Sequence, residues 1–282
     1  MIESKSISKV KLLKIHSNGK NEEATDFIAI EEPLEIRVEY GKIENRQTAN
    51  LTVTMRTPGC DDELAAGFLF SEGIIDNFDE IDSIAHINNF NSFENIILVK
   101  LKENVNFNLN KTERHFYTNS SCGVCGKTSI DAIKQVKKTN HKSIDNLKID
   151  KEIFYTLPTK LLEKQSIFEN TGGLHASALF DCNGNLITIK EDVGRHNALD
   201  KLLGYCLKNK LMPLDKYIIL LSGRASFELI QKAALADAKI IASIGAPSSL
   251  AIQTAIEFDI SYLGFLSSSK FNIYTAIHRI KS

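Results

Sequence analysis

Residues 217–246 read YIILLSGRASFELIQKAALADAKIIASIGA. Two short apolar runs flank a segment whose apolar residues recur at the three- and four-residue spacing of an amphipathic helix, and a glycine turn follows each run. This order predicts a buried strand, a helix and a second buried strand, which together form the unit from which parallel sheets are built. The stretch therefore indicates an α/β fold.

The same pattern extends to both sides of this stretch. Further apolar runs occur at LHASALF, NLITIK and SYLGFL, and two more helical patterns occur at RHNALDKLLGYCLKN and SSLAIQTAIEFD. Strands that alternate with helices predict crossover connections between neighbouring strands. We therefore expect residues 150–282 to form an α/β domain with a mixed or largely parallel sheet.

The first half of the chain has a different pattern. PLEIRVEY and TANLTVTMRTP alternate apolar and polar residues on either side of GKIENRQ, which predicts a hairpin with a longer loop. A helix is predicted over residues 62–71, where acidic residues come first, and ENIILVKL predicts another strand. We expect a β-rich N-terminal domain over residues 1–140 that ends in a CxxC loop and its helix. The polar segment KKTNHKSIDNLKID then serves as a linker or a surface loop.

Charge and composition limit the partners of the chain. The 282 residues have a net charge of −1 and a sequence pI of 6.7, so the chain lacks the overall basic field that holds nucleic acid or an anionic membrane. The N-terminus lacks the apolar core of a signal peptide, and no run approaches the roughly 20 apolar residues of a membrane span. Five cysteines do not suggest a disulfide framework. We expect a cytoplasmic protein with reduced thiols and no nucleic-acid or membrane partner.

The segment SSCGVCGKTS, residues 120–129, places Cys122 and Cys125 three residues apart between glycines. Three interpretations are open. A zinc site normally needs four Cys or His ligands, and a redox pair normally follows an early strand of a small βαβ domain. The third is a nucleophilic thiol on a flexible loop, suited to transient covalent chemistry such as carrying a persulfide. Lys127 and the N-terminus of a helix predicted from Thr128 favour a thiolate there.

Charged and polar residues follow the predicted strands of the second half. Arg195 lies near the N-terminus of one helix, Ser222, Gly223 and Arg224 form the turn before the next, and residues 245–249 repeat the pattern. Such turns at the carboxyl edge of a sheet can hold phosphates, although glycines there can also serve only to tighten the turns. The sequence has neither a Walker loop nor a G-x-G-x-x-G motif.

Several neighbouring residues have structural alternatives to a role in binding. Asp192 and Asn197 either cap the helix that follows or join Arg195 and His196 in the site. His175 is either a core or turn histidine or a ligand contact. The zinc-deaminase pattern needs a nearby glutamate and a downstream P-C-x-x-C, and LHAS and GAPSSL lack these groups. Hydrolytic deamination is therefore not expected.

Seven segments, in order, resemble the FdhD family of formate dehydrogenase accessory sulfurtransferases: MRTPGCDDELAAGFLFSEGII, SSCGVCGKTS, TGGLHASALF, EDVGRHNALDKLLG, LSGRASFELIQKA, GAPSSLAI and GFLSSSKFNIYT. The resemblance implies a cytoplasmic sulfur carrier that accepts persulfide sulfur from a cysteine desulfurase. It passes the sulfur to the molybdenum cofactor, bis(molybdopterin guanine dinucleotide), that formate dehydrogenase needs. The resemblance also implies a homodimer, a cytidine-deaminase-like second domain, and no metal held directly by the protein.

The resemblance assigns roles to particular residues. Cys122 corresponds to the persulfide-bearing cysteine and Cys125 to its partner, whereas Cys60 stands where an acidic residue is more usual. The family's cofactor-binding stretch corresponds to Phe265, Leu266, Ser267, Ser268, Ser269 and Lys270. Family members often have glycine or arginine where the three serines stand, but serine hydroxyls can still donate hydrogen bonds to phosphate. We expect the guanine nucleotide portion of the cofactor to contact this stretch together with Arg195, Ser222, Gly223 and Arg224.

Two other classes of function are compatible with the sequence. A non-covalent chaperone for formate dehydrogenase would shield the finished cofactor and deliver it, and would need Cys122 for affinity at most. A zinc-dependent structural or regulatory module would hold one metal ion per chain. Sulfur transfer and metal content therefore distinguish the three classes.

Overall fold

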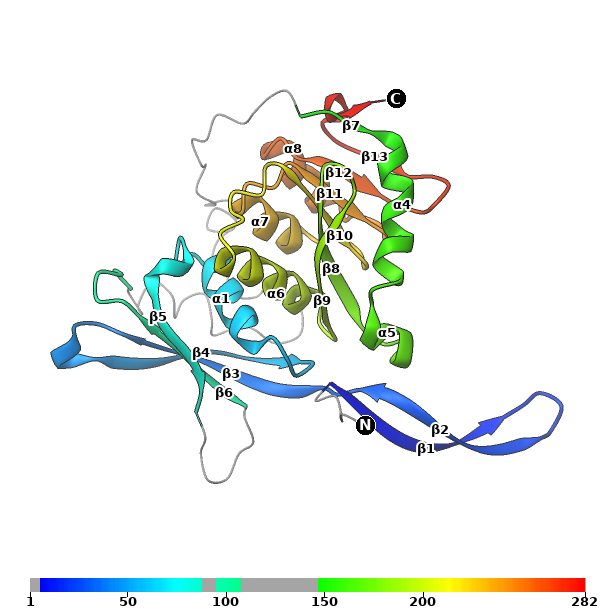
Figure 1. Ribbon diagram of the computed structural model, residues 1–282, viewed down its shortest axis with the longest axis horizontal. Coiled ribbons are helices and arrows are strands. Elements are labelled where there is room, and N and C mark those ends of the chain that lie inside the picture. The colour runs from blue at the N-terminus through cyan, green and yellow to red at the C-terminus, as the bar shows by residue number, and fades with distance from the viewer. Residues whose placement is uncertain (1–5, 88–94, 108–146, 282) are drawn as a thin grey trace.

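The structure is a computed structural model that describes residues 6–87, 95–107 and 147–281. Its largest sheet has six strands in the order β13-β12-β11-β10-β8-β9 (Figure 1). These strands are β8 (His175–Asp181), β9 (Leu186–Asp192), β10 (Tyr217–Leu221), β11 (Ile240–Ser243), β12 (Ser261–Gly264) and β13 (Asn272–Ile273). The five strands predicted from apolar runs in the second half are confirmed.

The sheet is mixed, and the directions of its strands determine which strands end at the same edge of the sheet. β10, β11 and β12 are parallel to one another, β8 is antiparallel to β10, and β9 is antiparallel to β8. β9 therefore runs in the same direction as β10, β11 and β12, although it is not their direct neighbour. The carboxyl ends of these four strands consequently lie along the same edge of the sheet.

Helices cover both faces of this sheet. The three predicted helices are α6 (Arg195–Lys208), α7 (Phe227–Leu235) and α8 (Ser249–Glu257), and they lie together on one side of it (Figure 1). The other side carries α4 (Lys151–Leu162), followed by the short α5 (Ser166–Thr171). Successive residues of β10 divide between the two faces, since Ile219 joins the core on the side of α6 and Ile218 joins the core on the side of α4.

The N-terminal part contains a second sheet, in the order β4-β3-β6-β5. Its strands are β3 (Glu32–Tyr40), β4 (Gln47–Arg56), β5 (Ile81–His86) and β6 (Ile96–Leu101), with the short 3₁₀ helices η1 (Ile43–Asn45) and η2 (Phe78–Glu80). α1 (Asp61–Ser71) confirms the helix predicted over residues 62–71. The predicted hairpin is also confirmed, because β3 and β4 pair antiparallel around the loop that holds η1.

Several elements were not predicted from the sequence. β1 (Ile7–Ile15) and β2 (Asn21–Ala29) form an antiparallel hairpin that is a sheet of its own. α4 and α5 were also missed. Near the C-terminus, β14 (Ile280–Lys281) follows η3 (Ile277–Arg279) and pairs with β7 (Ile149–Asp150). None of the helices that the structure describes is long and apolar enough to cross a membrane.

α1 and α6 join the two halves through a very close helix crossing. A Cβ atom on Gly67 would lie 1.8 Å from the carbonyl oxygen of Asp200, and one on Gly204 would lie 1.9 Å from that of Glu63. Only glycine allows two helix backbones to approach so closely. One core cluster accordingly includes side chains of α1, β3 and β6 together with side chains of α6, α7 and β11. The predicted domain boundary near residues 140–150 falls mostly outside the described residues and stays a prediction.

Candidate functional site at the carboxyl edge of the sheet

The four strands that share a direction end in four segments at the same edge of the sheet. β9 ends at Asp192, β10 at Leu221, β11 at Ser243 and β12 at Gly264. Backbone hydrogen bonds tie the segments after β10, β11 and β12 together: the Ala225 N–H donates to the Ala246 carbonyl at 3.1 Å, and the Phe265 N–H donates to the Gly245 carbonyl at 3.2 Å. The turns after β10, β11 and β12 therefore form one continuous edge, and the segment after β9 lies at the same edge of the sheet.

Two glycines lie where these turns approach one another most closely. A Cβ atom on Gly245 would lie 2.8 Å from the backbone nitrogen of Arg224, and one on Gly223 would lie 3.0 Å from Nδ1 of His175. Both glycines therefore do more than tighten their own turns, because they bring neighbouring turns into contact. Ser222 reinforces the arrangement, since its hydroxyl accepts a hydrogen bond from the Ala176 N–H at 2.7 Å.

Positive charge gathers at this edge. Arg195 is the first residue of α6, and its Nε is buried without a hydrogen-bond partner among the described residues. Arg224 is exposed and makes no hydrogen bond or ion pair with any part of the chain that the structure describes. Lys270 is exposed on the segment after β12. Guanidinium groups without partners among the described residues, next to the N-termini of α6 and α7, are well placed to bind an anion.

Glu228 pairs with a histidine at this edge. Its Oε2 lies 2.8 Å from Nε2 of His196. Ser226 occupies the N-cap position of α7, but its hydroxyl makes no capping hydrogen bond and lies 3.4 Å from the same imidazole nitrogen. Sequence reasoning did not find this cluster, because its members lie on two different helices. The interaction leaves Arg224 free of Glu228.

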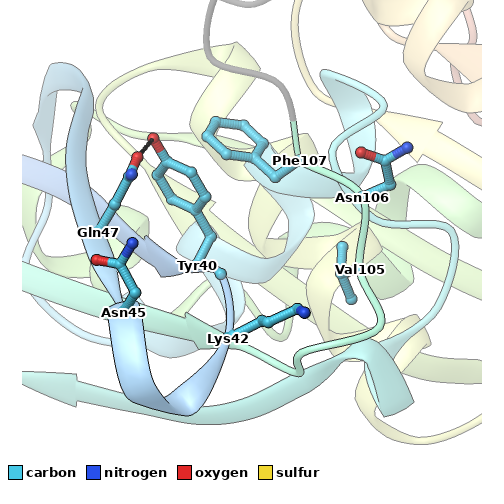
Figure 2. A pocket seen from close by; sticks show the side chains of 8 residues that line it. Tyr40, Lys42, Asn45, Gln47, Val105, Asn106 and Phe107 are labelled. Atoms are coloured by element: carbon cyan, nitrogen blue, oxygen red, sulfur yellow. Dashed lines mark hydrogen bonds between the residues drawn. The ribbon is translucent and has the colours of Figure 1, made fainter.

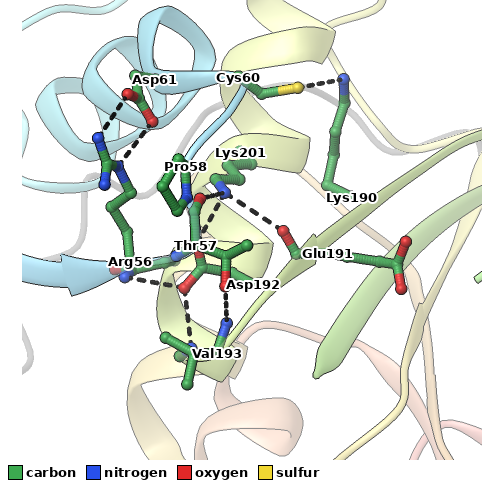
Figure 3. A network of polar contacts seen from close by, with 12 residues as sticks. Arg56, Thr57, Pro58, Cys60, Asp61, Lys190, Glu191, Asp192, Val193 and Lys201 are labelled. Atoms are coloured by element: carbon green, nitrogen blue, oxygen red, sulfur yellow. Dashed lines mark hydrogen bonds and ion pairs between the residues drawn. The ribbon is translucent and has the colours of Figure 1, made fainter. Parts of the chain in front are cut away.

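Asp192 and Asn197 are structural residues that hold the edge to the N-terminal part, and Figure 3 shows the contacts of Asp192 with Thr57 and Lys201. Asp192 is fully buried; its Oδ2 lies 2.7 Å from Nζ of Lys201 and accepts a hydrogen bond from the Thr57 N–H at 3.1 Å. Its Oδ1 accepts from the Gly194 N–H and from Nδ2 of Asn197, which also donates to the Met55 carbonyl. These contacts favour the structural alternative for both residues.

The segment from Phe265 to Lys270 divides into exposed and buried positions. Phe265 is 47% exposed and has a φ of 54°, a left-handed conformation that a bulky residue rarely adopts. Leu266 is 2% exposed and belongs to the core on the side of α4. The Ser267 hydroxyl closes a turn with the backbone of Lys270. Ser268, Ser269 and Lys270 are exposed. That these six residues bind the cofactor stays a prediction. The side chain of Leu266 lies in the core and does not face solvent.

His175 begins β8 and lies beside the charged groups of the edge. Burial lowers its pKa, as do the charges of Arg195 and His196, while Asp192 acts in the opposite direction. Between its folded and unfolded pKa values the unfolded chain binds more protons than the folded chain, so stability rises with pH through this window.

We therefore expect acidification below the ordinary histidine pKa of 6.5 to remove stability through His175. The fall in melting temperature between neutral pH and pH ~5.5 should be smaller in His175→Gln than in the unsubstituted protein. Thermal melts at both pH values measure the difference, and His278→Gln, at an exposed position, serves as the control. An identical pH dependence in His175→Gln would contradict this assignment.

The predicted sulfur-carrying residues, Cys122 and Cys125, lie outside the described residues. The other three cysteines have environments that disfavour a thiolate. Burial raises the pKa of Cys60, partly offset by Lys190, and raises the pKa of Cys182 together with nearby aspartates. Cys206 is fully buried, which raises its pKa to about 12. All three thiols are therefore mostly protonated at neutral pH, which disfavours a role as nucleophile.

A separate shallow cavity of about 360 Å³ lies in the N-terminal part (Figure 2). Its walls come from the end of β3, the loop around η1 and the segment after β6. The rings of Tyr40 and Phe107 meet edge to face with centroids 4.7 Å apart, and the Tyr40 hydroxyl donates to Oε1 of Gln47 at 3.0 Å. None of its lining residues belongs to the edge of the large sheet, so it is distinct from the candidate site.

The fold and the site together define a mixed α/β protein. Its β-rich N-terminal part packs, through α1 and α6, against the domain of the large sheet. Basic residues lie in the turns along one edge of that sheet. The chain belongs to the FdhD/NarQ family, whose model matches residues 29–281. This confirms the resemblance noted in the sequence.

Individual relatives match along nearly their whole length. The chain is 43% identical over 260 residues to the sulfur carrier protein FdhD of Streptomyces avermitilis, and the match covers 90% of this chain and 89% of the relative. It is 41% identical over 256 residues to the protein of the same name from Saccharolobus solfataricus, with 91% of each chain covered.

A solved structure shows the same fold. It is the crystal structure of a protein from Desulfotalea psychrophila that is provisionally assigned as a formate dehydrogenase accessory protein. The TM-score is 0.72 at 22% sequence identity, and the match covers 98% of this chain and 100% of that chain.

Proposed function

We propose that the chain is a cytoplasmic sulfur carrier that takes persulfide sulfur from a cysteine desulfurase and delivers it to the molybdenum cofactor of formate dehydrogenase. Relatives that match about nine-tenths of the chain bear the name sulfur carrier protein. The observation that carries the proposal is a sheet edge where Nε of Arg195 and the guanidinium of Arg224 have no partner among the described residues. A cofactor with a pyrophosphate group would satisfy both arginines.

Cys122 accepts the sulfur in this proposal. Its thiolate attacks the outer sulfur of the desulfurase persulfide, so an S–S bond forms at Cys122 while the S–S bond on the desulfurase breaks and its cysteine leaves as a thiolate. The exchange balances without an oxidant or a reductant. The raised pKa values of Cys60, Cys182 and Cys206 support this assignment, because these thiols are mostly protonated at neutral pH. Cys125 is the partner thiol.

The guanine dinucleotide of the cofactor binds as substrate at the carboxyl edge of the sheet. Arg195, Arg224 and Lys270 hold the phosphates, and the backbone of Ser222 and Gly223 completes this contact. The exposed ring of Phe265 provides a surface on which the guanine base can stack. The partners in this proposal are the desulfurase, formate dehydrogenase and a second copy of the chain, which forms a homodimer.

Replacement of Arg224 tests the phosphate contact. Arg224→Ala should weaken GDP binding by about tenfold to a hundredfold, because a charge-assisted hydrogen bond to phosphate contributes roughly 1.5–3 kcal/mol. Isothermal calorimetry with GDP measures the change. Since Arg224 is exposed and Glu228 is paired with His196, the thermal melt of the variant should be unchanged.

Lys210→Ala is the matched control for this experiment. Lys210 is another exposed cation, but it follows the C-terminal end of α6, whereas Arg195 begins that helix. The control should bind GDP like the unsubstituted protein. Unchanged GDP affinity in a stably folded Arg224→Ala protein would rule out the proposed phosphate contact.

Mass spectrometry tests the sulfur-carrier function itself. After incubation with a cysteine desulfurase and cysteine, the chain should gain one sulfur atom that maps to the peptide containing Cys122 and is released by a thiol reductant. A chain that gains no sulfur under these conditions, yet still binds GDP, would be the non-covalent cofactor chaperone instead.

A further inference from the structure

His196 lies where the first turns of α6 and α7 meet. It directly follows Arg195 on α6, and its Nε2 lies 2.8 Å from Oε2 of Glu228 and 3.4 Å from the Ser226 hydroxyl, both on the side of α7. Its side chain is 30% exposed, and Nδ1, the other ring nitrogen, makes no hydrogen bond with any residue that the structure describes. One nitrogen of the ring is therefore held by the protein and the other is available to a ligand.

The two helices that meet at His196 begin without a side-chain cap among the described residues. The N-cap residue of α6 is Gly194, which has no side chain, and Ser226 of α7 makes no capping hydrogen bond. At the start of α8, by contrast, the Ser248 hydroxyl accepts a hydrogen bond from the Ala251 N–H at 3.2 Å. The first N–H groups of α6 and α7 thus lack the acceptor that α8 has, and phosphate oxygens are well suited to that place.

The charged and titratable groups around His196 come from three elements. Arg195 lies on the same helix and Glu228 on α7, while His175 begins β8. The charges of Arg195 and His196 lower the pKa of His175, and Asp192 acts in the opposite direction. An anion bound beside Arg195 would place a further negative charge near the ring of His196, and a nearby opposite charge favours the protonated form of an imidazole.

We propose that His196, as an imidazolium, donates a hydrogen bond from Nδ1 to a phosphate of the bound guanine nucleotide, and that Glu228 is the positioning residue that holds its ring. In the neutral ring the proton stays on Nε2, where the carboxylate accepts it, so Nδ1 donates only after the ring takes up a second proton. Binding of the nucleotide is therefore coupled to proton uptake. The inference rests on the proposed binding of the cofactor's pyrophosphate at this edge, to which it adds one contact.

Calorimetry with GDP-mannose tests the contact. This probe is a pyrophosphate diester like the cofactor, and it lacks the second phosphate ionisation near pH ~6, so the protons taken up belong to the protein. Titrations at pH ~7 in PIPES and in ACES, two buffers with different ionisation enthalpies, should show net proton uptake by the unsubstituted chain. The uptake should fall in His196→Gln, and the part that remains measures the share of His175.

The affinity of the same variant should depend on pH. His196→Gln should weaken binding about tenfold at pH ~6, because it loses a charge-assisted hydrogen bond, and by less at pH ~8, where histidines are mostly neutral. His278→Gln, at an exposed position, is the matched control and should keep both the affinity and the proton uptake. A folded His196→Gln protein that keeps either the affinity at pH ~6 or the full proton uptake would overturn the contact.

Two substitutions of Glu228 test the positioning role. Glu228→Gln and Glu228→Ala both remove the negative charge, but only glutamine keeps an oxygen that accepts a hydrogen bond from Nε2 of His196. Glu228→Gln should therefore bind GDP-mannose about fivefold more tightly than Glu228→Ala, and the two should bind equally in a His196→Gln background. Thermal melts verify that each variant is folded, which is expected because both side chains are partly exposed.

The outcomes separate this inference from the proposed function. Equal affinities of Glu228→Gln and Glu228→Ala in the presence of His196 would overturn the positioning role. A folded, unsubstituted chain that binds neither GDP-mannose nor GDP would overturn the proposed cofactor site, and the contact of His196 with it.

Discussion

Gly67→Ala is expected to destabilise the protein by about 3 kcal/mol, although alanine is the better helix former by up to ~1 kcal/mol. The added Cβ would lie 1.8 Å from the carbonyl oxygen of Asp200, and the clashing atom is backbone, so no side chain can rotate away. α1 and α6 would have to separate. Their separation would open the core that both halves of the chain share, which is why the expected effect is large.

Gly204→Ala should have a similar effect, because its Cβ would lie 1.9 Å from the carbonyl oxygen of Glu63 at the same crossing. Urea unfolding monitored by circular dichroism measures the free energy of unfolding for both variants. Gly173→Ala is the control, since its φ lies outside the left-handed region and the nearest atom to its Cβ would be 3.7 Å away. If Gly67→Ala were as stable as the unsubstituted protein, the close crossing of α1 and α6 would be wrong.

The crossing also matters for the candidate site. Arg195 is the first residue of α6, and Asp192, just before the helix, is bonded to Thr57 from the N-terminal part. A shift of α6 relative to α1 would therefore move the start of the helix and the basic edge with it. The two glycines link the position of the N-terminal part to the geometry of the predicted phosphate contacts.

The central elements of the fold could be predicted because their sequence pattern is dominated by burial. β10 and β11 are continuous apolar runs, as strands covered on both faces must be, and α6, α7 and α8 have helical periodicity between such runs. The direction of β9 could not be predicted in this way. An apolar run does not show which strand it pairs with or in which direction. Only the structure therefore shows that the sheet is mixed.

The elements that were missed have identifiable reasons. The β1–β2 hairpin turns at Asn18 and Gly19, an Asn-Gly pair that favours hairpins, and Gly19 has a φ of 80°. The hairpin was missed in spite of this signal, because exposed apolar residues on both strands interrupt the alternation of apolar and polar residues that indicates a strand. α4 contains Pro158, which normally argues against a helix interior.

In the candidate site too, features of a contiguous stretch of sequence could be predicted, whereas contacts between distant segments could not. The basic turns could be found because glycines and arginines follow the strands directly, and the structure places these turns along one edge. The burial of Leu266 and the pairing of His196 with Glu228 depend on contacts between distant segments. A contiguous motif such as residues 265–270 predicts where a segment lies, but not which of its side chains reach solvent.

Cys122→Ala is expected to abolish activation of formate dehydrogenase, because the residue would be the sole acceptor of the persulfide sulfur. None of the described cysteines can replace it readily: Cys206 is fully buried with its pKa raised to about 12, and burial also raises the pKa of Cys60 and Cys182. A thiolate is the attacking species in persulfide exchange, so a protonated thiol reacts slowly. The assay compares formate dehydrogenase activity in cells that carry each variant in place of the unsubstituted chain.

Cys60→Ala is the matched control, since Cys60 is the most accessible of the described thiols and should be dispensable for activation. Cys125→Ala should impair activation less than Cys122→Ala does, because an external thiol can take the place of a resolving cysteine. GDP binding by the Cys122→Ala protein should be unchanged, which separates loss of sulfur transfer from loss of the cofactor site. Full activation by the Cys122→Ala protein would exclude the sulfur-carrier mechanism, and the basic edge of the sheet would then serve cofactor delivery alone.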